Sequence, residues 1–482
     1  MVVSLIITRV LLNQLGEDNY GIYNVVASVV ILFSFLNASL SQTIQRFITF
    51  SLGKGDLHRT SEVFSISLIS QFIICTVLII LCETIGVWFI NYKMVIGSEQ
   101  IYPANIAFQF SLLTFCINFF KVPYESSIIA YEKMSIYAYM SIIDVLLKLG
   151  VVYSIEILPG DKLISYTFLL AAESLIMLLV YRFYCIHKFD ICNFRLTWDT
   201  SLFKNIITFS GWNVFGAMAN IFSQKGVVIL LNVFVGLIAN AAMGITNQIY
   251  SALTTFINSF QTSFRPQIVK SYASDDLEYT KRLILTTSKF SFILVYIPST
   301  ILIINMPLIL NIWLNEVPQY TTIFCQLITL CCIVDAISGP YNCAIMATGN
   351  IRNYQLLLSI SCIIDVVFCY IILKLGLSIY LILVSRFLTR GIINMGVGLY
   401  YLKKIIQFDL ISYNTQVLRP VLLFTFLQIP VLYLLTTIAN GWSLMIMSTL
   451  FISCIGIPCA YFIMLSRWEK NYVKEILSKL WK

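Results

Sequence analysis

Charged residues and histidines are scarce in this chain. Only 11% of its 482 residues are Asp, Glu, Lys or Arg, whereas a soluble domain carries about 25%. There are two histidines, and no group of His, Cys, Asp and Glu has the spacing of a metal site. No glycine-rich phosphate loop of the GxxxxGK[ST] type occurs either. We therefore predict no metal, no cofactor and no ATP-hydrolysing motor, and we expect a protein that is not an enzyme.

Paired cysteines are also missing. The thirteen cysteines are scattered through apolar stretches, and none belongs to a CxxC motif. Single cysteines in such stretches usually behave as small buried hydrophobic residues. The sequence therefore predicts packed thiols rather than metal ligands or redox centres.

What the chain has instead is a row of long apolar segments. Hydrophobic residues make up 59% of the sequence, and the mean hydropathy is +0.86. About fourteen segments of roughly 20 residues follow one another, and a helix of that length crosses the hydrocarbon core of a bilayer. No stretch is left over for a soluble catalytic domain. We predict an all-α polytopic membrane protein.

Basic residues are distributed unevenly between the predicted connectors. With the N-terminus placed inside, the inside connectors and the C-terminal tail hold 23 of the 31 Lys and Arg residues, and the outside connectors hold three. Lys121 and Lys289 count here as residues of inside connectors. Because positive charge collects on the cytoplasmic side, we predict that both termini are cytoplasmic. The net charge of +8 then reflects membrane topology and not nucleic-acid binding.

The first apolar segment is short. Residues 1–13 form a helix of only about 20 Å, less than the thickness of the hydrocarbon core, and residues 14–21 are typical of an outside turn. The segment has neither the charged start nor the small-residue cleavage site of a signal peptide. We expect a first helix that lacks its inner turns.

Two stretches, one in each half of the chain, have a similar pattern. The first runs from Gly16 to Arg46 and the second from Gly236 to Arg265, and each contains Phe-x-Asn. Six further apolar segments follow each of them, and two halves of similar topology are typical of transporters. We predict an N-terminal lobe (1–186), a basic cytoplasmic linker (187–205), a C-terminal lobe (206–402), and two further helices with a basic tail (403–482).

Several short motifs resemble those of one transporter family. They are LGxxxYGxY (15–23), QRF (45–47), NVFVG (232–236), NAA (240–242), FQT (260–262) and PQIVKSYA (266–273), with residues 17–19 and 22 variable in the first. With these motifs the chain resembles bacterial oligosaccharide-lipid flippases, which export O-antigen and capsule repeat units. They belong to the multidrug/oligosaccharidyl-lipid/polysaccharide exporter superfamily. The resemblance covers nearly the whole chain, and the short first helix departs from it.

The resemblance implies both a fold and a function. The fold has two pseudo-symmetric lobes of six helices and two C-terminal helices, similar to multidrug and toxic compound extrusion transporters. The cargo is an oligosaccharide on undecaprenyl pyrophosphate, which moves by alternating access from the inner to the outer leaflet of the bacterial cytoplasmic membrane. A polysaccharide polymerase and export machinery are the further partners that the family implies.

Charged residues within the predicted spans are functional candidates, because embedding one costs at least about 2.5–3.5 kcal/mol. The embedded acids that are candidates for ion coupling are Asp144, Glu173, Asp335 and Asp365. The candidate cations for the pyrophosphate are Arg9, Arg46, Lys225, Arg265, Arg386 and Arg390. Arg46 and Arg265 end the two similar stretches at the inner side, so they either anchor the topology or bind phosphate through their planar donors. The family's lipid-linked peptidoglycan precursor flippases place arginines on helices one, two and eight, which Arg9, Arg46 and Arg265 would match.

Spacing suggests partners for some of these charges. Asp144 and Lys148 are four residues apart and can pair on one helix face. Arg386 and Arg390 have the same spacing but like charge, so they need either an anionic ligand or an acid from another helix, such as Asp365 or Asp335. The sequence leaves both interpretations open.

Two other functions compete with the flippase. A drug or cation antiporter needs acids for its coupling ion, and both halves of this chain carry candidates. An integral-membrane polymerase, ligase or acyltransferase usually needs a large outer loop or histidines within its spans, and neither is expected here. The embedded arginines favour an anionic cargo and hence the flippase. The tail, residues 467–482, is predicted to form a basic amphipathic helix on the inner leaflet.

Overall fold

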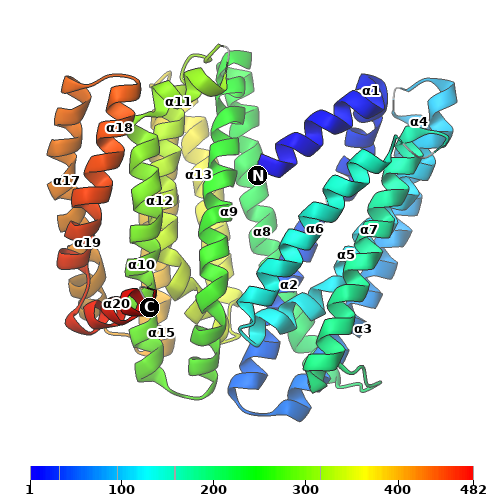
Figure 1. Cartoon of the computed structure of the whole chain (residues 1–482), viewed down its shortest axis with the longest axis horizontal. Coiled ribbons are helices and arrows are strands. Elements are labelled where there is room, and N and C mark those ends of the chain that lie inside the picture. Colours follow the sequence, from blue (N-terminus) through cyan, green and yellow to red (C-terminus); the bar gives the residue numbers. More distant parts are fainter. Residues whose placement is uncertain (1, 32, 95, 157–158, 315, 481–482) are drawn as a thin grey trace. The chain divides into compact units, whose positions relative to one another are not determined.

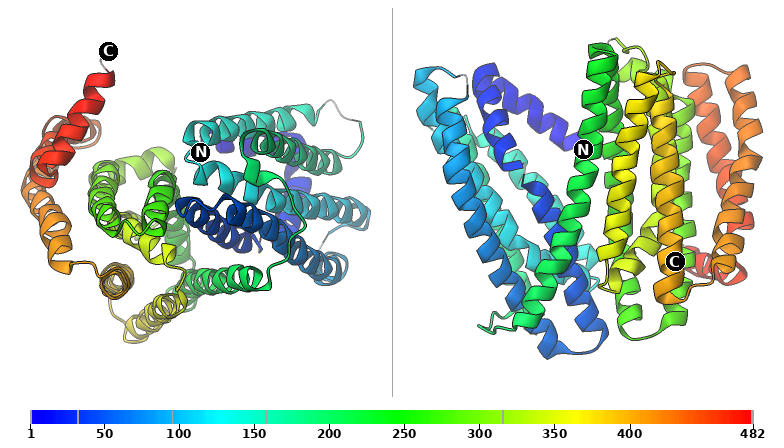
Figure 2. Two further views of the ribbon diagram at one scale, coloured as in Figure 1. Left: turned by 90° about the horizontal axis from the view of Figure 1, so that it is seen from below. Right: turned by 180° about the vertical axis from the view of Figure 1, so that it is seen from behind.

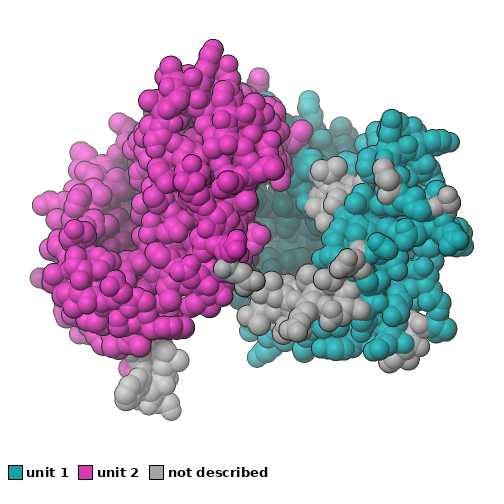
Figure 3. All heavy atoms as spheres, turned by 90° about the horizontal axis from the view of Figure 1, so that it is seen from above, with its two compact units in different colours: residues 1–214 teal, residues 215–482 magenta. Residues whose placement is uncertain are grey.

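Helices form every regular element in the described part of the chain. The structure is a computed structural model that describes residues 2–31, 33–94, 96–156, 159–314 and 316–480. Two compact units, residues 1–214 and 215–482, divide the chain, and Figure 3 colours them separately. The first unit ends within helix α8. The lobe limits predicted from the sequence stay a prediction.

In its described residues unit 1 consists of seven α-helices and the first part of an eighth, which Figure 1 labels. They are α1 (Val2–Ile31), α2 (Ser34–Gly53), α3 (Leu57–Leu81), α4 (Val87–Tyr92), α5 (Ile101–Ala130), α6 (Met134–Ser154), α7 (Lys162–Lys188) and the first part of α8 (Thr200–Phe234). Helices α5 and α7 lie side by side, and α2 packs against α5. In the core of this unit the rings of Phe64 on α3 and Tyr124 on α5 meet edge to face, with their centroids 5.3 Å apart.

Unit 2 contains the remainder of α8 and the helices that follow it (Figure 2). They are α9 (Leu237–Ala273), α10 (Leu277–Ile304), α11 (Met306–Trp313), α12 (Thr321–Ala347), α13 (Arg352–Lys374), α14 (Leu381–Arg386), α15 (Asn394–Ile406), α16 (Leu410–Tyr413), α17 (Arg419–Ile438), α18 (Trp442–Phe451), α19 (Ile457–Met464) and α20 (Arg467–Leu480). Helix α12 packs between α9 and α10, and α17 and α18 pack against α10. A π-helical turn, Phe387–Ile393, joins α14 to α15.

The all-α membrane fold predicted from hydropathy is confirmed. Eleven helical segments in the described residues are long and apolar enough to cross a membrane. The other three predicted segments are also helical, in the first part of α1, in its second part with α2, and in α9. Large apolar side chains such as Phe72, Phe426 and Phe462 are exposed on the helix surfaces, as expected of residues that face lipid.

The predicted outside turn near residue 16 is reduced to a kink. Helix α1 continues on both sides of Gly16, whose φ of 77° and ψ of 168° are not helical. Gly236, which precedes α9, has nearly the same backbone conformation, with φ 106° and ψ −168°. Both lie in the region that glycine alone adopts freely. The two similar stretches of sequence therefore begin with the same local backbone geometry.

Aspartates stand directly before the first residue of several helices. Asp56, Asp161, Asp276 and Asp409 each accept backbone N–H bonds at the first turn of α3, α7, α10 and α16. Asp199 does the same for α8, at 3.0 Å from a backbone nitrogen. These caps satisfy donors that a helix leaves unpaired. The backbone N–H of the capped turn, and then the Arg59 guanidinium, lower the pKa of Asp199 below its ordinary value.

Among the residues that the charge count placed in inside connectors, Lys121 and Lys289 lie well inside helices. Lys121 lies within α5 and not in a connector, because α5 continues to Ala130. Lys289 lies in α10, with only 2% of its surface exposed. Their assignment to inside connectors is wrong. Each lysine lies at the border between an apolar run and more polar residues, and the helix extends beyond that border.

The structure of the cysteines and of the tail agrees with the predictions made from the sequence. All thirteen cysteines are free thiols, and eleven of them are buried. Residues 467–480 form helix α20, as predicted. One acid of this helix, Glu469, is buried and pairs with Lys289, at 2.5 Å between Oε2 and Nζ. A basic amphipathic tail was expected, but this contact with α10 was not.

Candidate functional site

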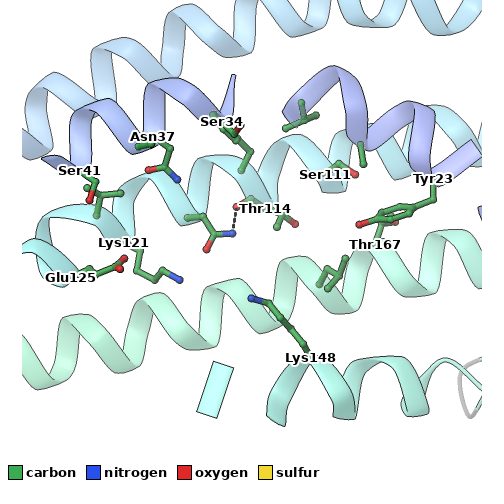
Figure 4. Close-up of a pocket in the computed structure, with 17 residues that line it drawn as sticks. Tyr23, Ser34, Asn37, Ser41, Ser111, Thr114, Lys121, Glu125, Lys148 and Thr167 are labelled. Atoms are coloured by element: carbon green, nitrogen blue, oxygen red, sulfur yellow. Dashed lines mark hydrogen bonds between the residues drawn. The ribbon is translucent and has the colours of Figure 1, made fainter. Parts of the chain in front are cut away.

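Unit 1 contains a polar cavity of about 590 Å³ (Figure 4). It opens between α1, α2, α5, α6 and α7. Serines, threonines and asparagines dominate its wall, together with two lysines and one glutamate: Ser34, Asn37, Ser41, Ser111, Thr114, Asn118, Thr167, Lys121, Lys148 and Glu125. The aromatic side chains of Tyr23 and Phe115 and five aliphatic residues complete it: Ala27, Val30, Ala38, Val122 and Leu170. Because apolar helices surround it, this cavity offers polar groups at a depth where lipid supplies none.

Charged side chains of both signs stand at one side of the cavity. The Lys148 ammonium lies 2.5 Å from Oδ2 of Asp144, and the Lys121 ammonium lies 3.9 Å from Oδ1 of the same residue. The pairing of Asp144 with Lys148 that the spacing suggested is therefore present. In Figure 4 the ends of Lys121 and Lys148 point into the space between the helices.

Glu173 on α7 adds a buried acid to this group. Its residue is 3% exposed, and its Oε1 atom has no hydrogen-bond partner among the described residues. Ser174 donates to its other oxygen at 3.4 Å. Glu173 lies within electrostatic range of Lys148, Asp144 and Lys121. The structure thus brings together two of the predicted ion-coupling acids, Asp144 and Glu173.

In unit 2 the embedded charges form a buried network, in which Arg386 Nη2 has no hydrogen-bond partner among the described residues. Asp365 on α13 accepts hydrogen bonds from Arg386 Nε at 3.2 Å, from Ser223 at 2.9 Å and from Thr389 at 3.3 Å. The side chains of Asp365 and Arg386 are 2% and 3% exposed. Of the two interpretations that the sequence left open for Arg386, the pairing with an acid is therefore the one observed.

Arg390 lies one turn further, in the π-helical turn. It donates to Asn220 Oδ1 at 3.2 Å and to the Tyr250 hydroxyl at 3.4 Å, and its Nε has no partner among the described residues. Both partners are neutral. Asp335 on α12 is half-buried and lies within electrostatic range of Arg390. Unit 2 thus assembles Arg386, Arg390 and Asp365, and it places Asp335 near them.

The remaining predicted cations are more dispersed. The Arg46 guanidinium in unit 1 lies 4.6 Å from the ring centroids of both Phe47 and Phe50. In unit 2, Lys225 is exposed and Arg265 is half-buried. Arg9 belongs to α1, but its side chain lies outside the described residues. No group of three or more metal-binding side chains occurs in the part of the chain that the structure describes.

Comparison with known protein families shows to which family this chain belongs. Residues 1–272, more than half of its length, match the family described as "Polysaccharide biosynthesis protein". The chain belongs to this family. No curated protein matches the chain.

Solved structures similar to this polysaccharide biosynthesis family member share its fold. A crystal structure of a MATE mutant superposes with a TM-score of 0.73 at 13% identity, covering 84% of this chain and 93% of that one. A MATE-family multidrug resistance transporter of the MOP superfamily, outward-facing, gives 0.71 at 12% identity over 84% and 92%. A MOP superfamily transporter from Pyrococcus furiosus, whose title reports reverse polarity of its binding pocket, gives 0.71 at 13% identity over 86% and 93%. The family member thus has the fold of MATE and MOP superfamily transporters.

Sequence reasoning missed the wall of the cavity of this family member, and only Asp144 and Glu173, which lie beside that wall, were among the predicted site residues. Lys121, Glu125, Asn37 and Asn118 were not among the predicted site residues. A signal was present: on α5 the polar residues 111, 114, 118, 121 and 125 recur every three or four positions. Such a spacing places them on one helix face. On α2, residues 34, 37 and 41 follow the same rule.

Proposed function

We propose that this protein flips a lipid-linked oligosaccharide across the bacterial cytoplasmic membrane by alternating access, for the export of a polysaccharide. The observation that carries the proposal is the polar cavity of unit 1. Transmembrane helices embed polar and charged side chains only at a cost, and a cavity lined by them is suited to hydrophilic cargo. The family of the chain supplies the link to polysaccharides.

The proposal extends to the pyrophosphate that links sugar to lipid. Arg46, Lys225 and Arg265 are our proposed ligands for it, with Arg9 as a further candidate, since arginine donors match phosphate oxygens. Arg390 is a second-rank candidate because its two partners are neutral. Arg386 is the weakest, since its charge is already balanced by Asp365 at 3.2 Å.

Export in cells tests the proposal. The gene is expressed in a flippase-null strain, and surface polysaccharide is measured while membrane insertion is checked in parallel. We expect restored export in a strain that makes the cognate repeat unit. Arg46→Lys and Arg265→Lys should lower export if the guanidinium geometry binds phosphate. They should be silent if the residues only anchor the topology, because lysine serves that purpose equally well. Full export by the Arg46→Ala, Arg265→Ala double variant would contradict the phosphate role.

Membrane topology gives an independent check. We propose that both termini are cytoplasmic, because of the charge asymmetry of the connectors. Reporter fusions after Lys188 and after Lys482 should both report the cytoplasm. Export of either reporter would overturn the proposed orientation.

A drug or cation antiporter is the second candidate. The specific observation in its favour is the group of charges beside the cavity, where three acids, Glu125, Asp144 and Glu173, accompany two lysines. Expressed in a strain that lacks its drug efflux pumps, the protein should leave ethidium accumulation unchanged if the flippase proposal is right. Reduced accumulation that depends on Glu173 would favour the antiporter.

A further inference from the structure

Three hydroxyl groups of the unit 1 cavity have already used their protons. Ser111, Thr114 and Thr167 each donate to the backbone carbonyl four residues earlier in their helix, at 2.7, 2.8 and 3.0 Å. A hydroxyl has one proton and two acceptor lone pairs. What these three side chains can still offer to a ligand is therefore acceptor capacity.

The two asparagines of the wall have the same character. Asn118 donates through Nδ2 to the Thr114 carbonyl at 3.0 Å and to the Ser174 hydroxyl at 3.2 Å, which occupies its donors and leaves Oδ1. Oδ1 of Asn37 is buried and has no hydrogen-bond partner among the described residues. An unpartnered buried acceptor costs about 1–3 kcal/mol unless a ligand or water supplies a proton. Because Oδ1 of Asn37 is buried, Asn118 is the asparagine that presents an acceptor to the cavity.

This acceptor-rich wall discriminates between the parts of the proposed cargo. Phosphate oxygens are acceptors at neutral pH and gain nothing from serine, threonine and amide oxygens that have no proton to give. Sugar hydroxyls both donate and accept. They can donate to the oxygens of the wall and accept from the ammonium groups of Lys121 and Lys148. The ring faces of Tyr23 and Phe115 can contact the apolar face of a sugar ring.

We propose that the unit 1 cavity is the site that binds the sugar hydroxyls of the cargo, and that the pyrophosphate is held elsewhere. This inference rests on the proposed function. The volume of the cavity, about 590 Å³, lies in the range of about 300–1,000 Å³ that small-molecule sites occupy. The cavity therefore has room for a short oligosaccharide.

Isosteric variants test the acceptor wall. Thr114→Val and Thr167→Val keep the shape of the side chain and remove its oxygen. Thr76→Val is the matched control, because Thr76 makes the same bond to a carbonyl four residues earlier, at 2.9 Å, on α3 and outside the cavity. Purified protein in detergent is mixed with methyl glycosides of glucose, galactose and N-acetylglucosamine, with maltotriose and with pyrophosphate. Binding is followed by saturation-transfer NMR, and thermal unfolding verifies that each variant is folded.

We expect at least one saccharide to bind to the wild type and to Thr76→Val. Each lost acceptor should weaken that binding by about five- to tenfold, and the signal of pyrophosphate should not change. Saccharide binding that is equal in all variants, or the absence of saccharide binding to the folded wild type, would overturn the inference. Loss of tetraphenylphosphonium binding in the two cavity variants, with no saccharide bound, would assign the cavity to organic cations instead.

The export assay separates this inference from the proposed function. If the wild type fails to restore export in strains with the cognate repeat unit, the proposed function is wrong. If the wild type restores export and both cavity variants export at its rate, the proposed function stands and the sugar site is not in this cavity.

Discussion

The embedded ion pairs of the two units differ in their exposure and in their surroundings. In unit 1, Asp144 and Lys148 are 21% and 41% exposed, and they stand beside a cavity. In unit 2, Asp365 and Arg386 are at most 3% exposed, and hydroxyl groups complete the bonds of the carboxylate. Both pairs join acids and bases on apolar helices, so their position within a predicted span does not distinguish them. Charge in a span marks a candidate, but the space around it separates a binding group from a structural one.

The largest effect is expected from breaking the pair in unit 2. Asp365→Ala would leave the Arg386 guanidinium buried without its counter-charge, and such losses cost about 3–5 kcal/mol. We expect a lower thermal unfolding temperature in detergent and a smaller amount of protein in the membrane. Both measurements are needed because the variant protein is predicted to be poorly stable.

A double variant separates the lost partner from lost packing. Asp365→Leu combined with Arg386→Met replaces both charges with apolar groups of similar size, which is often close to neutral. We expect it to recover most of the stability. If Asp365→Ala alone costs less than about 1 kcal/mol, the network of unit 2 is not the structural element described here.

Lys289 and Glu469 form a second buried pair in unit 2. We expect the stability of this pair to depend on pH. Burial acts to raise the pKa of Glu469, but hydrogen bonds from Lys289 and from the Ser466 backbone N–H outweigh it and lower the pKa. A carboxyl group with a lowered pKa stabilises the folded state above the pKa of an unfolded glutamate, about 4.3. Its contribution is lost as the pH falls through the lowered value.

We therefore expect α20 to stay docked between pH 5 and 7 and to detach at pH values below about 4. Hydrogen exchange over residues 467–480, corrected for the intrinsic rate, measures the docking. At pH 7, Glu469→Gln should raise exchange in α20, while Lys474→Gln, at an exposed position of the same helix, should not. The effect is smaller than that of Asp365→Ala because a terminal helix can detach alone. Equal exchange in both variants would show that the pair does not hold the helix.

The fold was predictable from the sequence because it depends on a local property. Runs of apolar residues fix where helices lie, and hydropathy is read directly from the chain. Lys121 and Lys289 show the limit of this approach. Each basic residue marks the point at which a run loses its apolar character, but a helix continues for as long as its backbone bonds are satisfied.

The site was predictable only in part, and the reason is distance along the chain. Asp144 and Lys148 are four residues apart, and their pairing follows from the helix period. Asp365 and Arg386 are 21 residues apart, and Lys289 and Glu469 are 180 apart, so their pairing depends on how helices pack. The wall of the cavity could have been predicted from the sequence, because the polar residues on α5 recur with the period of a helix.

The smallest effect on stability, with a clear effect on transport, is expected from Lys148→Met in unit 1. Its pair with Asp144 is partly exposed, and exposed pairs at this spacing contribute about 0.3–0.5 kcal/mol. The unfolding temperature should therefore hardly change. If the cavity binds cargo, however, removal of a donor from its wall should lower export about fivefold or more. Lys281→Met is the matched control, because Lys281 pairs with Glu278 three residues away, at 2.9 Å, on another helix, and it should change neither quantity. A loss of stability as large as that of Asp365→Ala would remove the contrast between the units, and unchanged export would exclude Lys148 from the transport path.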